Sequence, residues 1–474
     1  MIRYKIIGPP GTGKTTKLLQ YLEETLRSVP AENVAFVSFT RRGAYEGCMR
    51  AKKAFELKDA QLRYFRTLHS ICFQELGLRK HRVLGPKHYV ELTNALGINF
   101  TGKISYEFLG SDGDRYLAAC DLMRNNPEAF EEVIKDLDYK RLQFVAHNLA
   151  RYKQQRGVMT FSDMLYEYYL HGDPLDVKVA FIDEAQDLTT LQWGVVEKAF
   201  RNADVMYIAG DDDQAIYEWA GADVQYFMDF EADHYKVLDY SARLPQRVFD
   251  YSSHILHNIS NREEKLFRPR ESVGVVDTMT HWSQLKEHID GQTLILARNF
   301  ATLKDVTKEL RYLGINYLYK GESPVDAKAI RAIQLYEEWR KLPDDRERRH
   351  MVELYSDYFV RFDASLPWFE VFSNRSDATF YRALLANKVD FAAEPYVQVN
   401  TIHASKGSEC DHVILALDFS PKVYAHYCKD PDSELRCLYV GATRAKERLT
   451  IKLREGIYGY PERLQEDANE HQAL

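Results

Sequence analysis

The sequence predicts an α/β fold with two parallel-sheet domains, each interrupted by a mainly helical insertion. Near the start, an apolar run at residues 2–7, a glycine loop and a helical stretch lead to a second apolar run at residues 34–39. Strand, loop, helix and strand at this spacing form a βαβ unit, and such units build parallel sheets. A second, late group of buried-strand patterns predicts the other sheet, and two long charged helical stretches predict the insertions.

Each predicted domain is assembled from separate segments of the chain. Further buried-strand patterns for the first sheet lie at residues 177–182 and 205–209, and those for the second sheet at 293–297, 397–400, 413–417 and 449–452. We therefore expect residues 1–75 and 165–240 to form the first domain around a helical insertion at 76–164. We expect residues 241–300 and 396–474 to form the second domain around an insertion at 301–395.

The composition describes a folded protein without a strong global charge. Of 474 residues, 45% are hydrophobic and 28% are charged, and the formal net charge is −7. This balance excludes a disordered or fibrous chain and gives no overall attraction to nucleic acid, although a local basic groove would still permit binding. The apolar runs are shorter than the roughly 20 residues that cross a bilayer. With no signal-peptide pattern at the start, we expect a cytoplasmic protein.

The cysteines are scattered along the chain without the spacing of a metal site or a CxxC pair. We expect them to be reduced structural thiols. The six positions are Cys48, Cys72, Cys120, Cys410, Cys428 and Cys437.

A phosphate-binding loop is the most specific local pattern. Residues 8–15, GPPGTGKT, match GxxxxGK[ST] between an apolar strand and a helix. In such a loop backbone N–H groups point at phosphate oxygens, the lysine reaches the β- and γ-phosphates, and the next hydroxyl holds Mg²⁺. The partial positive charge of the helix N-terminus also favours the anion. The sequence thus predicts ATP and Mg²⁺ as ligands, bound by Gly8, Pro9, Pro10, Gly11, Thr12, Gly13, Lys14, Thr15 and Thr16.

Two carboxylates suited to nucleotide hydrolysis follow the strand pattern at residues 177–182. Asp183, at the strand end, is expected to hold Mg²⁺ together with Thr15, and Glu184 to orient and activate the attacking water. Gln214 follows the next strand and could contact the γ-phosphate. Positive charge on the γ-phosphate speeds phosphoryl transfer; Arg243 and Arg444 are candidates for it, although the residues alone do not separate them from other arginines.

The ordered set of motifs resembles the UvrD/Rep-type superfamily 1 DNA helicases across essentially the whole chain. Residues 8–15 are similar to the family's motif I, 36–44 to its TFTNKAA segment, 67–70 to TFHS and 161–165 to DFDDLL. Residues 183–187 match motif II, 210–222 are close to GDDDQSIYxWRGA, 401–409 are similar to TLHSAKGLE, and 438–445 match LxYVGxTRA.

The resemblance implies two RecA-like domains with one nucleotide site shared between them. Lys14, Asp183, Glu184 and Gln214 take the catalytic positions of the first domain. Arg243 and Arg444 become arginine fingers from the second domain, and Glu409 would bond the ribose of the nucleotide. ATP binding would then close the two domains and hydrolysis would release them.

The resemblance also implies a path for single-stranded DNA. Stacked aromatic side chains and backbone-contacting donors bind single strands without reading their sequence. Phe39, Tyr217 and Trp219 match the family's base-stacking positions, although the alternative remains that Phe39 and Tyr217 are core residues. The positions that match backbone-contacting segments are Thr40, Arg41, Thr67, His69, Thr401 and His403; the two histidines could also be structural.

Departures from the family pattern affect base recognition and duplex handling. Ala242 replaces the motif IV tyrosine that would stack on adenine, and we expect the adenine-reading glutamine segment before the first strand to be missing. These differences predict a relaxed nucleotide preference, unless another aromatic residue fills the gap. Ala220 replaces the motif III arginine, and the second insertion is shorter than the family's regulatory subdomain, so we expect a compact helicase with altered autoinhibition or duplex handling.

The leading hypothesis is an ATP-dependent DNA helicase that moves 3′→5′ on single strands, a polarity that only the resemblance implies. Two alternatives remain: a single-strand translocase that removes proteins without unwinding duplex, and a nucleotide-gated loader that hydrolyses poorly. Single-stranded DNA and duplex junctions are the expected partners. RNA stays open because stacking aromatics do not distinguish the sugars, and the sequence leaves the pathway and the oligomeric state open.

Overall fold

The computed structural model describes residues 1–103, 111–135, 137–461 and 464. The chain forms two compact units. The first contains residues 1–244, 258–270 and 432–437, and the second contains residues 245–257, 271–431 and 438–474. Each unit holds one six-stranded sheet, so the predicted α/β class with two parallel-sheet domains is confirmed.

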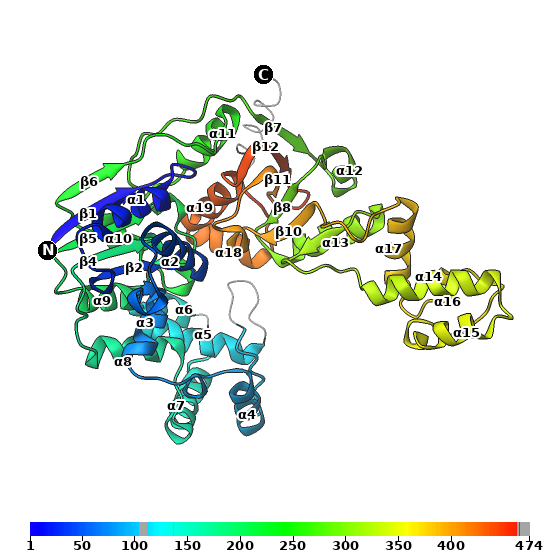
Figure 1. The fold of residues 1–474 in the computed structure, drawn as a ribbon, viewed down its shortest axis with the longest axis horizontal. Coiled ribbons are helices and arrows are strands. Elements are labelled where there is room, and N and C mark those ends of the chain that lie inside the picture. The colour runs from blue at the N-terminus through cyan, green and yellow to red at the C-terminus, as the bar shows by residue number, and fades with distance from the viewer. Residues whose placement is uncertain (104–110, 136, 462–463, 465–474) are drawn as a thin grey trace. The chain divides into compact units, whose positions relative to one another are not determined.

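The sheet of the first unit is parallel throughout and has the strand order β3-β2-β4-β5-β1-β6. Its strands are β1 (Ile2–Ile7), β2 (Val34–Ser38), β3 (Phe65–Arg66), β4 (Val179–Asp183), β5 (Val205–Gly210) and β6 (His234–Val237). The neighbours β4, β5 and β1 occupy the middle of the sheet (Figure 1). Because the strands are parallel, the loops that follow them emerge at one edge of the sheet.

Helices cover both faces of this sheet, because alternate strand residues point to opposite sides. Ile7, Val37 and Ile182 contribute to one hydrophobic core, while Ile6, Phe36 and Phe181 contribute to the other. The helices next to the sheet are α1 (Lys14–Leu26), α2 (Arg41–Phe55), α3 (Leu68–Glu75), α8 (Phe161–His171), α9 (Thr190–Ala199) and α10 (Val224–Asp229).

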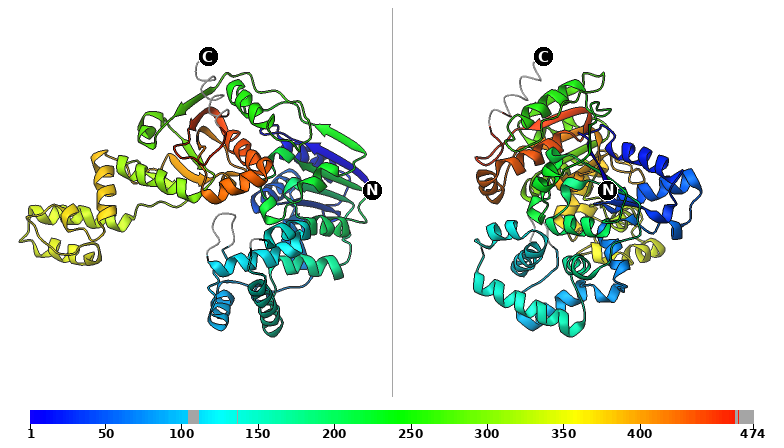
Figure 2. Two further views of the ribbon diagram at one scale, coloured as in Figure 1. Left: turned by 180° about the vertical axis from the view of Figure 1, so that it is seen from behind. Right: turned by 90° about the vertical axis from the view of Figure 1, so that its left-hand side faces the viewer.

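The first insertion is helical, as predicted, and has a hydrophobic core of its own. Its helices are α4 (Pro86–Leu96), α5 (Asp112–Asn125), α6 (Pro127–Ile134) and α7 (Tyr139–Arg156). Leu92 of α4, Leu117 of α5 and Val145 of α7 are buried together in that core. Both views in Figure 2 show α4 and α7 at the end of the insertion farthest from the sheet of the same unit.

The sheet of the second unit is also parallel and has the strand order β7-β12-β11-β8-β10-β9. Its strands are β7 (Val275–Met279), β8 (Thr293–Ala297), β9 (Tyr317–Tyr319), β10 (Val397–Thr401), β11 (Cys410–Ala416) and β12 (Ala445–Lys452). The helices outside the insertion are α11 (Gln246–Leu256), α12 (Leu285–His288), α18 (Pro421–Lys429) and α19 (Pro431–Ala442).

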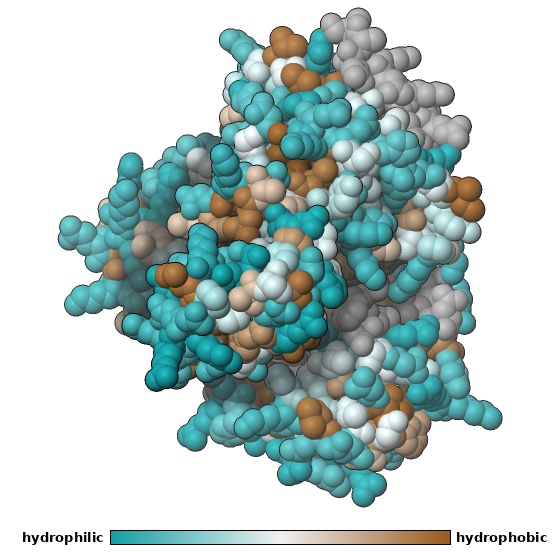
Figure 3. All heavy atoms as spheres, turned by 90° about the vertical axis from the view of Figure 1, so that its right-hand side faces the viewer, coloured by the Kyte–Doolittle hydropathy of each residue, from teal (hydrophilic) through white to brown (hydrophobic). Residues whose placement is uncertain are grey.

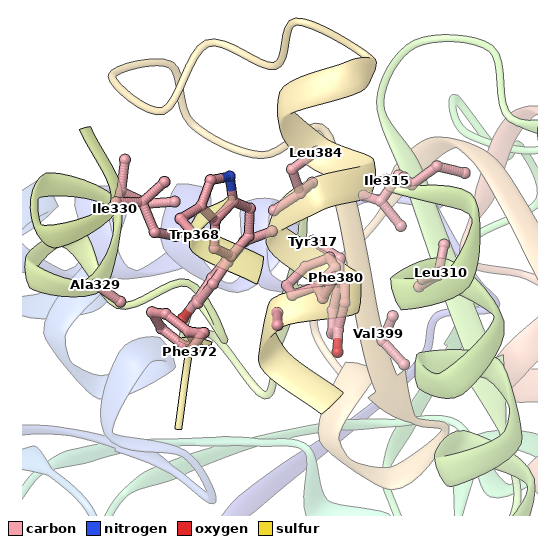
Figure 4. Packing of buried hydrophobic residues seen from close by; sticks show 14 of the residues in the cluster. Leu310, Ile315, Tyr317, Ala329, Ile330, Trp368, Phe372, Phe380, Leu384 and Val399 are labelled. Atoms are coloured by element: carbon pink, nitrogen blue, oxygen red, sulfur yellow. The ribbon is translucent and has the colours of Figure 1, made fainter. Parts of the chain in front are cut away.

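The second insertion shares a core with its sheet instead of forming a separate one. Val399 of β10 and Leu310 of α13 belong to the same buried cluster as Trp368, Phe380 and Leu384 of the insertion (Figure 4). The helices of this region are α13 (Phe300–Leu313), α14 (Ala327–Lys341), α15 (Arg346–Glu353), α16 (Trp368–Val371) and α17 (Arg375–Ala386).

On the face shown in Figure 3, hydrophobic residues of the described part of the chain lie in groups among hydrophilic ones. Exposed apolar side chains such as Leu354 and Val360 occur in the second insertion. Among the helices that the structure describes, none combines the length and the apolar character needed to span a membrane. All six cysteines are free thiols, as expected.

Candidate nucleotide site

The candidate site lies at the carboxyl ends of three adjacent strands of the first sheet. The phosphate loop follows β1, Asp183 ends β4, and Asp211 follows β5. Since β4, β5 and β1 are neighbours, residues far apart in the sequence meet at this edge. Ligands of open α/β sheets bind at such strand ends.

The loop backbone is shaped by two glycines in the left-handed region. Gly11 has φ 74° and Gly13 has φ 78°, conformations that other residues adopt only with strain. Gly13 is the N-cap of α1 and provides no side-chain cap, and the first turn carries no acidic residue. The first backbone N–H groups of α1 therefore remain available to an anion.

The two residues after Gly13 contact the carboxylates that follow β4. Lys14 is buried, and its Nζ donates to Glu184 Oε2 at 3.0 Å. The Thr15 hydroxyl donates to Asp183 Oδ2 at 2.9 Å. Burial disfavours the Lys14 ammonium, but the attraction of Glu184 and Asp183 outweighs it and raises the pKa of Lys14. The lysine thus stays charged, as phosphate binding requires.

A Mg²⁺ ion fits the pair formed by Thr15 and Asp183. Burial and the neighbouring Glu184 raise the pKa of Asp183 to about 6, so the carboxylate lacks sufficient compensation for its charge. A divalent cation would supply that compensation. Mg²⁺ prefers hard oxygen ligands and is commonly held by one or two protein oxygens together with water and substrate phosphates. The hydroxyl and carboxylate oxygens present here match that preference.

Glu184 has a strained backbone. Its φ is 56° and its ψ 42°, in the left-handed region where residues other than glycine are uncommon. It directly precedes the short 3₁₀ helix η4 (Ala185–Asp187). Residues held in sparsely populated conformations concentrate at functional sites. Here the turn directs the carboxylate of Glu184 toward Lys14.

A chain of hydrogen bonds joins Glu184 to the residues after β5. Gln186 Nε2 donates to Glu184 Oε2 at 2.6 Å, and Gln186 Oε1 accepts from the Asp211 backbone N–H at 3.1 Å. Asp211 Oδ2 accepts from Gln214 Nε2 at 2.6 Å. Gln214 ends the 3₁₀ helix η5 (Asp212–Gln214). The residues expected to activate water and to contact the γ-phosphate are therefore connected.

The segment that contains Arg243 lies against the phosphate loop. Ser241 Oγ donates to the Pro10 carbonyl at 2.7 Å, and the Ala242 N–H donates to the Gly11 carbonyl at 2.9 Å. A Cβ at Gly11 would lie 2.3 Å from the Arg243 Cβ, so the glycine permits this approach. The sequence assigned Arg243 to the second domain, whereas the structure includes residues up to Leu244 in the first unit.

The second unit brings together two other predicted residues, Glu409 and Arg444. The residues that flank Glu409 both bond Arg444: the Ser408 carbonyl accepts from its Nη1 at 3.3 Å, and the Cys410 N–H donates to its carbonyl at 3.0 Å. Arg444 Nε also donates to the Val440 carbonyl at 2.9 Å, and the side chain is buried.

The predicted DNA residues of the first unit lie on several loops after the strands. Phe39 and Tyr217 contact each other with ring centroids 5.3 Å apart, and both are half-buried. Trp219 is half-buried in the 3₁₀ helix η6 (Glu218–Ala220). Arg41 is exposed at the start of α2, where Thr40 forms the N-cap. Aromatic and cationic groups are thus available on this unit.

His69 and Thr67 also have local structural contacts. Thr67 caps α3, and its Oγ1 lies 2.9 Å from Ser70 Oγ. The His69 ring packs edge-on against Phe161 at 5.9 Å, and burial lowers its pKa to about 4. His69 is therefore neutral at physiological pH and could contribute hydrogen bonds but no charge.

The predicted DNA residues of the second unit flank the end of β10. Thr401 is the last residue of β10, and its Oγ1 accepts from the Ala404 N–H at 3.2 Å. His403 begins the 3₁₀ helix η9 (His403–Ser405).

Sequence reasoning missed Gln186, Ser241 and Lys265. Gln186 lies within a quoted motif but had no assigned role, and Ser241 had no distinguishing pattern. Lys265 is buried against three aspartates that follow β5. The run of aspartates at 211–213 signalled a need for a cation, but nothing in the sequence selects one lysine among 63 lysines and arginines.

Comparison with known families matches both halves of the chain. Residues 3–235 match the UvrD/REP helicase N-terminal domain, and residues 396–451 match the UvrD-like helicase C-terminal domain. Together the two matches cover more than half of the sequence. The first includes the phosphate loop and the second includes Arg444.

Two curated relatives show the same similarity at low identity. The ATP-dependent DNA helicase PcrA of Staphylococcus epidermidis (strain RP62A) is 22% identical over 317 residues, covering 61% of this chain and 42% of the relative. PcrA of Staphylococcus aureus (strain Mu50) is 23% identical over 287 residues, covering 55% and 38%. The matched region therefore spans about two fifths of each relative.

Proposed function

Because this chain belongs to the UvrD/Rep-type superfamily 1 helicases, we propose that it is an ATP-dependent DNA helicase that moves 3′→5′ on single strands. The observation that carries the proposal is the meeting of Lys14, Thr15, Asp183, Glu184 and Gln214 at one edge of the first sheet. The polarity rests on family resemblance.

In this proposal the first unit binds the triphosphate through backbone and side-chain charge. The N–H groups at the start of α1 and the Lys14 ammonium bind the phosphates. Thr15 and Asp183 hold Mg²⁺, which neutralises phosphate charge when bound. Glu184 orients a water molecule and accepts its proton, and its contact with Lys14 positions the carboxylate beside the phosphate-binding lysine.

Two arginines complete the proposed chemistry. Positive charge on the transferring phosphoryl group is worth about 10³–10⁵ in rate. Arg243 is anchored to the phosphate loop by its neighbours Ser241 and Ala242. Arg444 and Glu409 are contributed by the second unit, so we propose that hydrolysis depends on both units and that ATP couples their motion to DNA.

The proposed single-strand path uses stacking and phosphate contacts. Phe39, Tyr217 and Trp219 would stack on bases, and donors on Thr40, Arg41, Thr67 and His69 would contact the backbone. Thr401 and His403 would contribute from the second unit. None of these residues is assigned to read the hydrogen-bonding edges of the bases, so we expect binding that is insensitive to DNA sequence.

Steady-state ATP hydrolysis with and without oligo-dT tests the activity. We expect DNA to stimulate turnover, Lys14→Ala to abolish nucleotide binding, and Glu184→Gln to bind nucleotide while losing about 10²–10⁴-fold in turnover. Wild-type protein that binds DNA but shows no DNA-stimulated hydrolysis would favour a nucleotide-gated loader and reject the helicase proposal.

Duplex substrates distinguish unwinding from translocation. Fluorescent duplexes with a 3′ or a 5′ single-stranded overhang should be separated only from the 3′ side. Hydrolysis and streptavidin displacement from a biotinylated single strand without strand separation would identify a translocase. An oligo-U strand in place of oligo-dT tests whether RNA also stimulates hydrolysis.

We further propose a relaxed base preference, supported by Ala242 at the position where the family stacks a tyrosine on adenine. Tyr240, two residues earlier, is 43% exposed, with the Arg268 guanidinium 5.6 Å from its ring centroid. We expect ATP and GTP to differ by less than about tenfold in kcat/KM, a factor worth roughly 1.4 kcal/mol. A strong preference for ATP that Tyr240→Ala removes would identify Tyr240 as the replacement aromatic.

A further inference from the structure

Three consecutive aspartates after β5 are almost completely buried within the first unit. Asp211, Asp212 and Asp213 are 0%, 0% and 1% exposed. Carboxylates in such an environment stay charged only when cations or hydrogen-bond donors compensate them. The compensation comes from the segment at residues 258–270, which follows an excursion of the chain into the second unit.

Lys265 contacts all three of these aspartates. Its Nζ lies 2.8 Å from Asp211 Oδ1 and 3.0 Å from Asp213 Oδ2, and it also pairs with Asp212 Oδ1. The Lys265 side chain is itself fully buried. Burial disfavours the ammonium, but the attraction of the three carboxylates outweighs it and raises the pKa of Lys265. The lysine is therefore a permanent cation at the centre of the cluster.

Arg262 provides the second cation. Its Nε and Nη2 donate to the two oxygens of Asp213 at 2.8 and 2.7 Å. Arg262 pairs with Asp213, whereas Lys265 is the cation of this pair that contacts Asp211. The cluster of three carboxylates and two cations carries a net charge of about −1, and without Lys265 that charge would be about −2 at a buried site.

Asp211 connects this cluster to the nucleotide site. One of its oxygens binds Lys265, and the other accepts from Gln214 Nε2. Its backbone N–H donates to Gln186, whose amide in turn donates to Glu184. Rotation or protonation of the Asp211 carboxylate would therefore disturb its bond to Gln214, the expected γ-phosphate contact.

We propose that Lys265 is a positioning residue for hydrolysis: its ammonium fixes the Asp211 carboxylate, and that carboxylate fixes Gln214. This inference rests on the proposed ATPase function. Lys265 contacts no nucleotide-binding residue directly and acts through the aspartate. In this proposal a residue from a distant segment holds Gln214, the expected contact of the γ-phosphate, in place.

If Lys265 had a purely structural role, its substitution would lower turnover only as far as it lowers stability. The same segment offers a matched control for this alternative. Lys5, only 2% exposed, forms an ion pair with Glu263 at 2.8 Å. Glu263→Gln removes this pair two residues from Lys265 while the Glu263 backbone N–H keeps its bond to Asp212. If the segment serves only to stabilise the unit, both substitutions should lower stability, and turnover should follow stability.

The test compares Lys265→Met, Lys265→Arg and Glu263→Gln with the wild type in the 474-residue chain. Each is measured for thermal midpoint, affinity for a fluorescent ADP analogue, KM and kcat. We expect Lys265→Met to lose about 10- to 100-fold in kcat, the usual effect of removing a supporting contact. Its ADP affinity should stay within about threefold of wild type, because ADP lacks the γ-phosphate that Gln214 would contact. Lys265→Arg should restore part of kcat, and Glu263→Gln should keep it.

A charge-matched variant covers the case in which Lys265→Met does not fold. Lys265→Met combined with Asp212→Asn leaves two carboxylates and Arg262, which restores the wild-type net charge of the cluster. Asp212→Asn alone retains Lys265 and should keep near wild-type kcat. The double variant should show the same 10- to 100-fold loss of kcat relative to this single variant.

The outcomes separate the inference from the function on which it rests. Absent hydrolysis by the wild type rejects the proposed function. Wild-type hydrolysis with an unchanged kcat in the folded Lys265 variants rejects the inference alone. Parallel losses of stability, ADP affinity and kcat in the Lys265 and Glu263 variants would also reject it, because they indicate a structural role.

Discussion

Glu184 combines a chemically important carboxylate with an unfavourable backbone conformation. At φ 56° its Cβ is crowded, at a cost of about 1–2 kcal/mol that glycine would avoid. We predict that Glu184→Gly is more stable than Glu184→Ala by about 1 kcal/mol in urea unfolding, although both lose turnover. In the last turn of α1 the exposed Glu24 provides the control, where alanine should be more stable than glycine. Equal stability of the two Glu184 variants would contradict a strained turn.

Trp219 is the aromatic residue for which we most expect stacking on a base. It lies in η6 among polar and small residues, outside the strands of the sheet. We predict that Trp219→Ala weakens oligo-dT binding by about 1–3 kcal/mol, measured by fluorescence anisotropy. Hydrolysis without DNA should change little. Tyr312→Ala, at an exposed aromatic of α13, is the control, and an equal effect there would argue against a specific stacking role.

At the residue scale the sequence predicted the groups that follow recognisable local patterns. Lys14, Thr15, Asp183, Glu184 and Gln214 lie in motifs attached to strand ends, and the structure brings them together. Gln186 and Lys265 were not predicted to take part. The roles proposed for them rest on contacts across 25 and 54 positions of the chain, for which a single sequence provides no signal.

At the scale of elements, all eight interior strands were predicted and all four edge strands were missed. The missed strands β3, β6, β7 and β9 lie at the ends of the two strand orders. β6 is mostly exposed, and β3 has only two residues. An interior strand is buried on both faces and forms a continuous apolar run, whereas an edge strand lacks this pattern. The sequence thus predicted the centre of each sheet but not its full width.

Three strands of the second sheet share a buried polar contact, and we expect this contact to make the sheet sensitive to acid. His412 Nε2 lies 2.8 Å from Thr450 Oγ1, and that hydroxyl donates to Asp277 Oδ1 at 2.5 Å. Because the hydroxyl proton is directed at Asp277, Nε2 must be the donor to Thr450. Burial, together with the nearby Arg448 guanidinium, lowers the pKa of His412 to about 4.

The sign of the pH effect follows from this lowered pKa. Between pH 6.5 and about 4 the unfolded chain binds a proton at His412 that the folded chain does not. The free energy of unfolding should therefore fall as the pH falls through this window, by up to about 1.4 kcal/mol per pH unit. We predict faster hydrogen exchange, corrected for intrinsic rates, in peptides from β11 and β12 at pH 5.5 than at pH 7.

His412→Gln tests the origin of this effect because the glutamine amide can still donate to Thr450 but does not titrate. The variant should show a smaller acceleration of exchange between pH 7 and pH 5.5. His257→Gln, at an exposed position, should leave it unchanged. An acceleration that is identical in His412→Gln would assign the acid sensitivity to another group.

For the whole molecule, the first unit depends on segments that come late in the chain. Residues 258–270 supply Lys265 and Arg262, and residues 432–437 supply Arg436, which pairs with Glu218 at 3.0 Å. The sequence predicted two sheets and two insertions correctly. It did not predict that the first unit includes segments from beyond residue 244. Ion pairs between distant residues leave no periodic pattern in the sequence.

We predict that a fragment of residues 1–244 is much less stable than a fragment of residues 1–270. The shorter fragment leaves Asp211, Asp212 and Asp213 buried without their cations, and breaking a buried ion pair in this way costs about 3–5 kcal/mol. Urea unfolding and limited proteolysis of the two fragments measure the difference. Lys265→Met in the longer fragment should remove much of its advantage, and equal stability of the two fragments would contradict the prediction.

The late segments also affect the order of events during synthesis. A ribosome has completed the first sheet once residue 244 emerges, but the last contributing segment ends at residue 437. About 190 residues separate these points, which corresponds to roughly 10–40 s at about 5–20 residues per second. The partners of the three aspartates, Lys265 and Arg262, are made early in this interval, but Arg436, the partner of Glu218, is made only at its end. The first unit therefore completes its ion pairs only after residue 437 has been made, and a chaperone would have the most effect before that point.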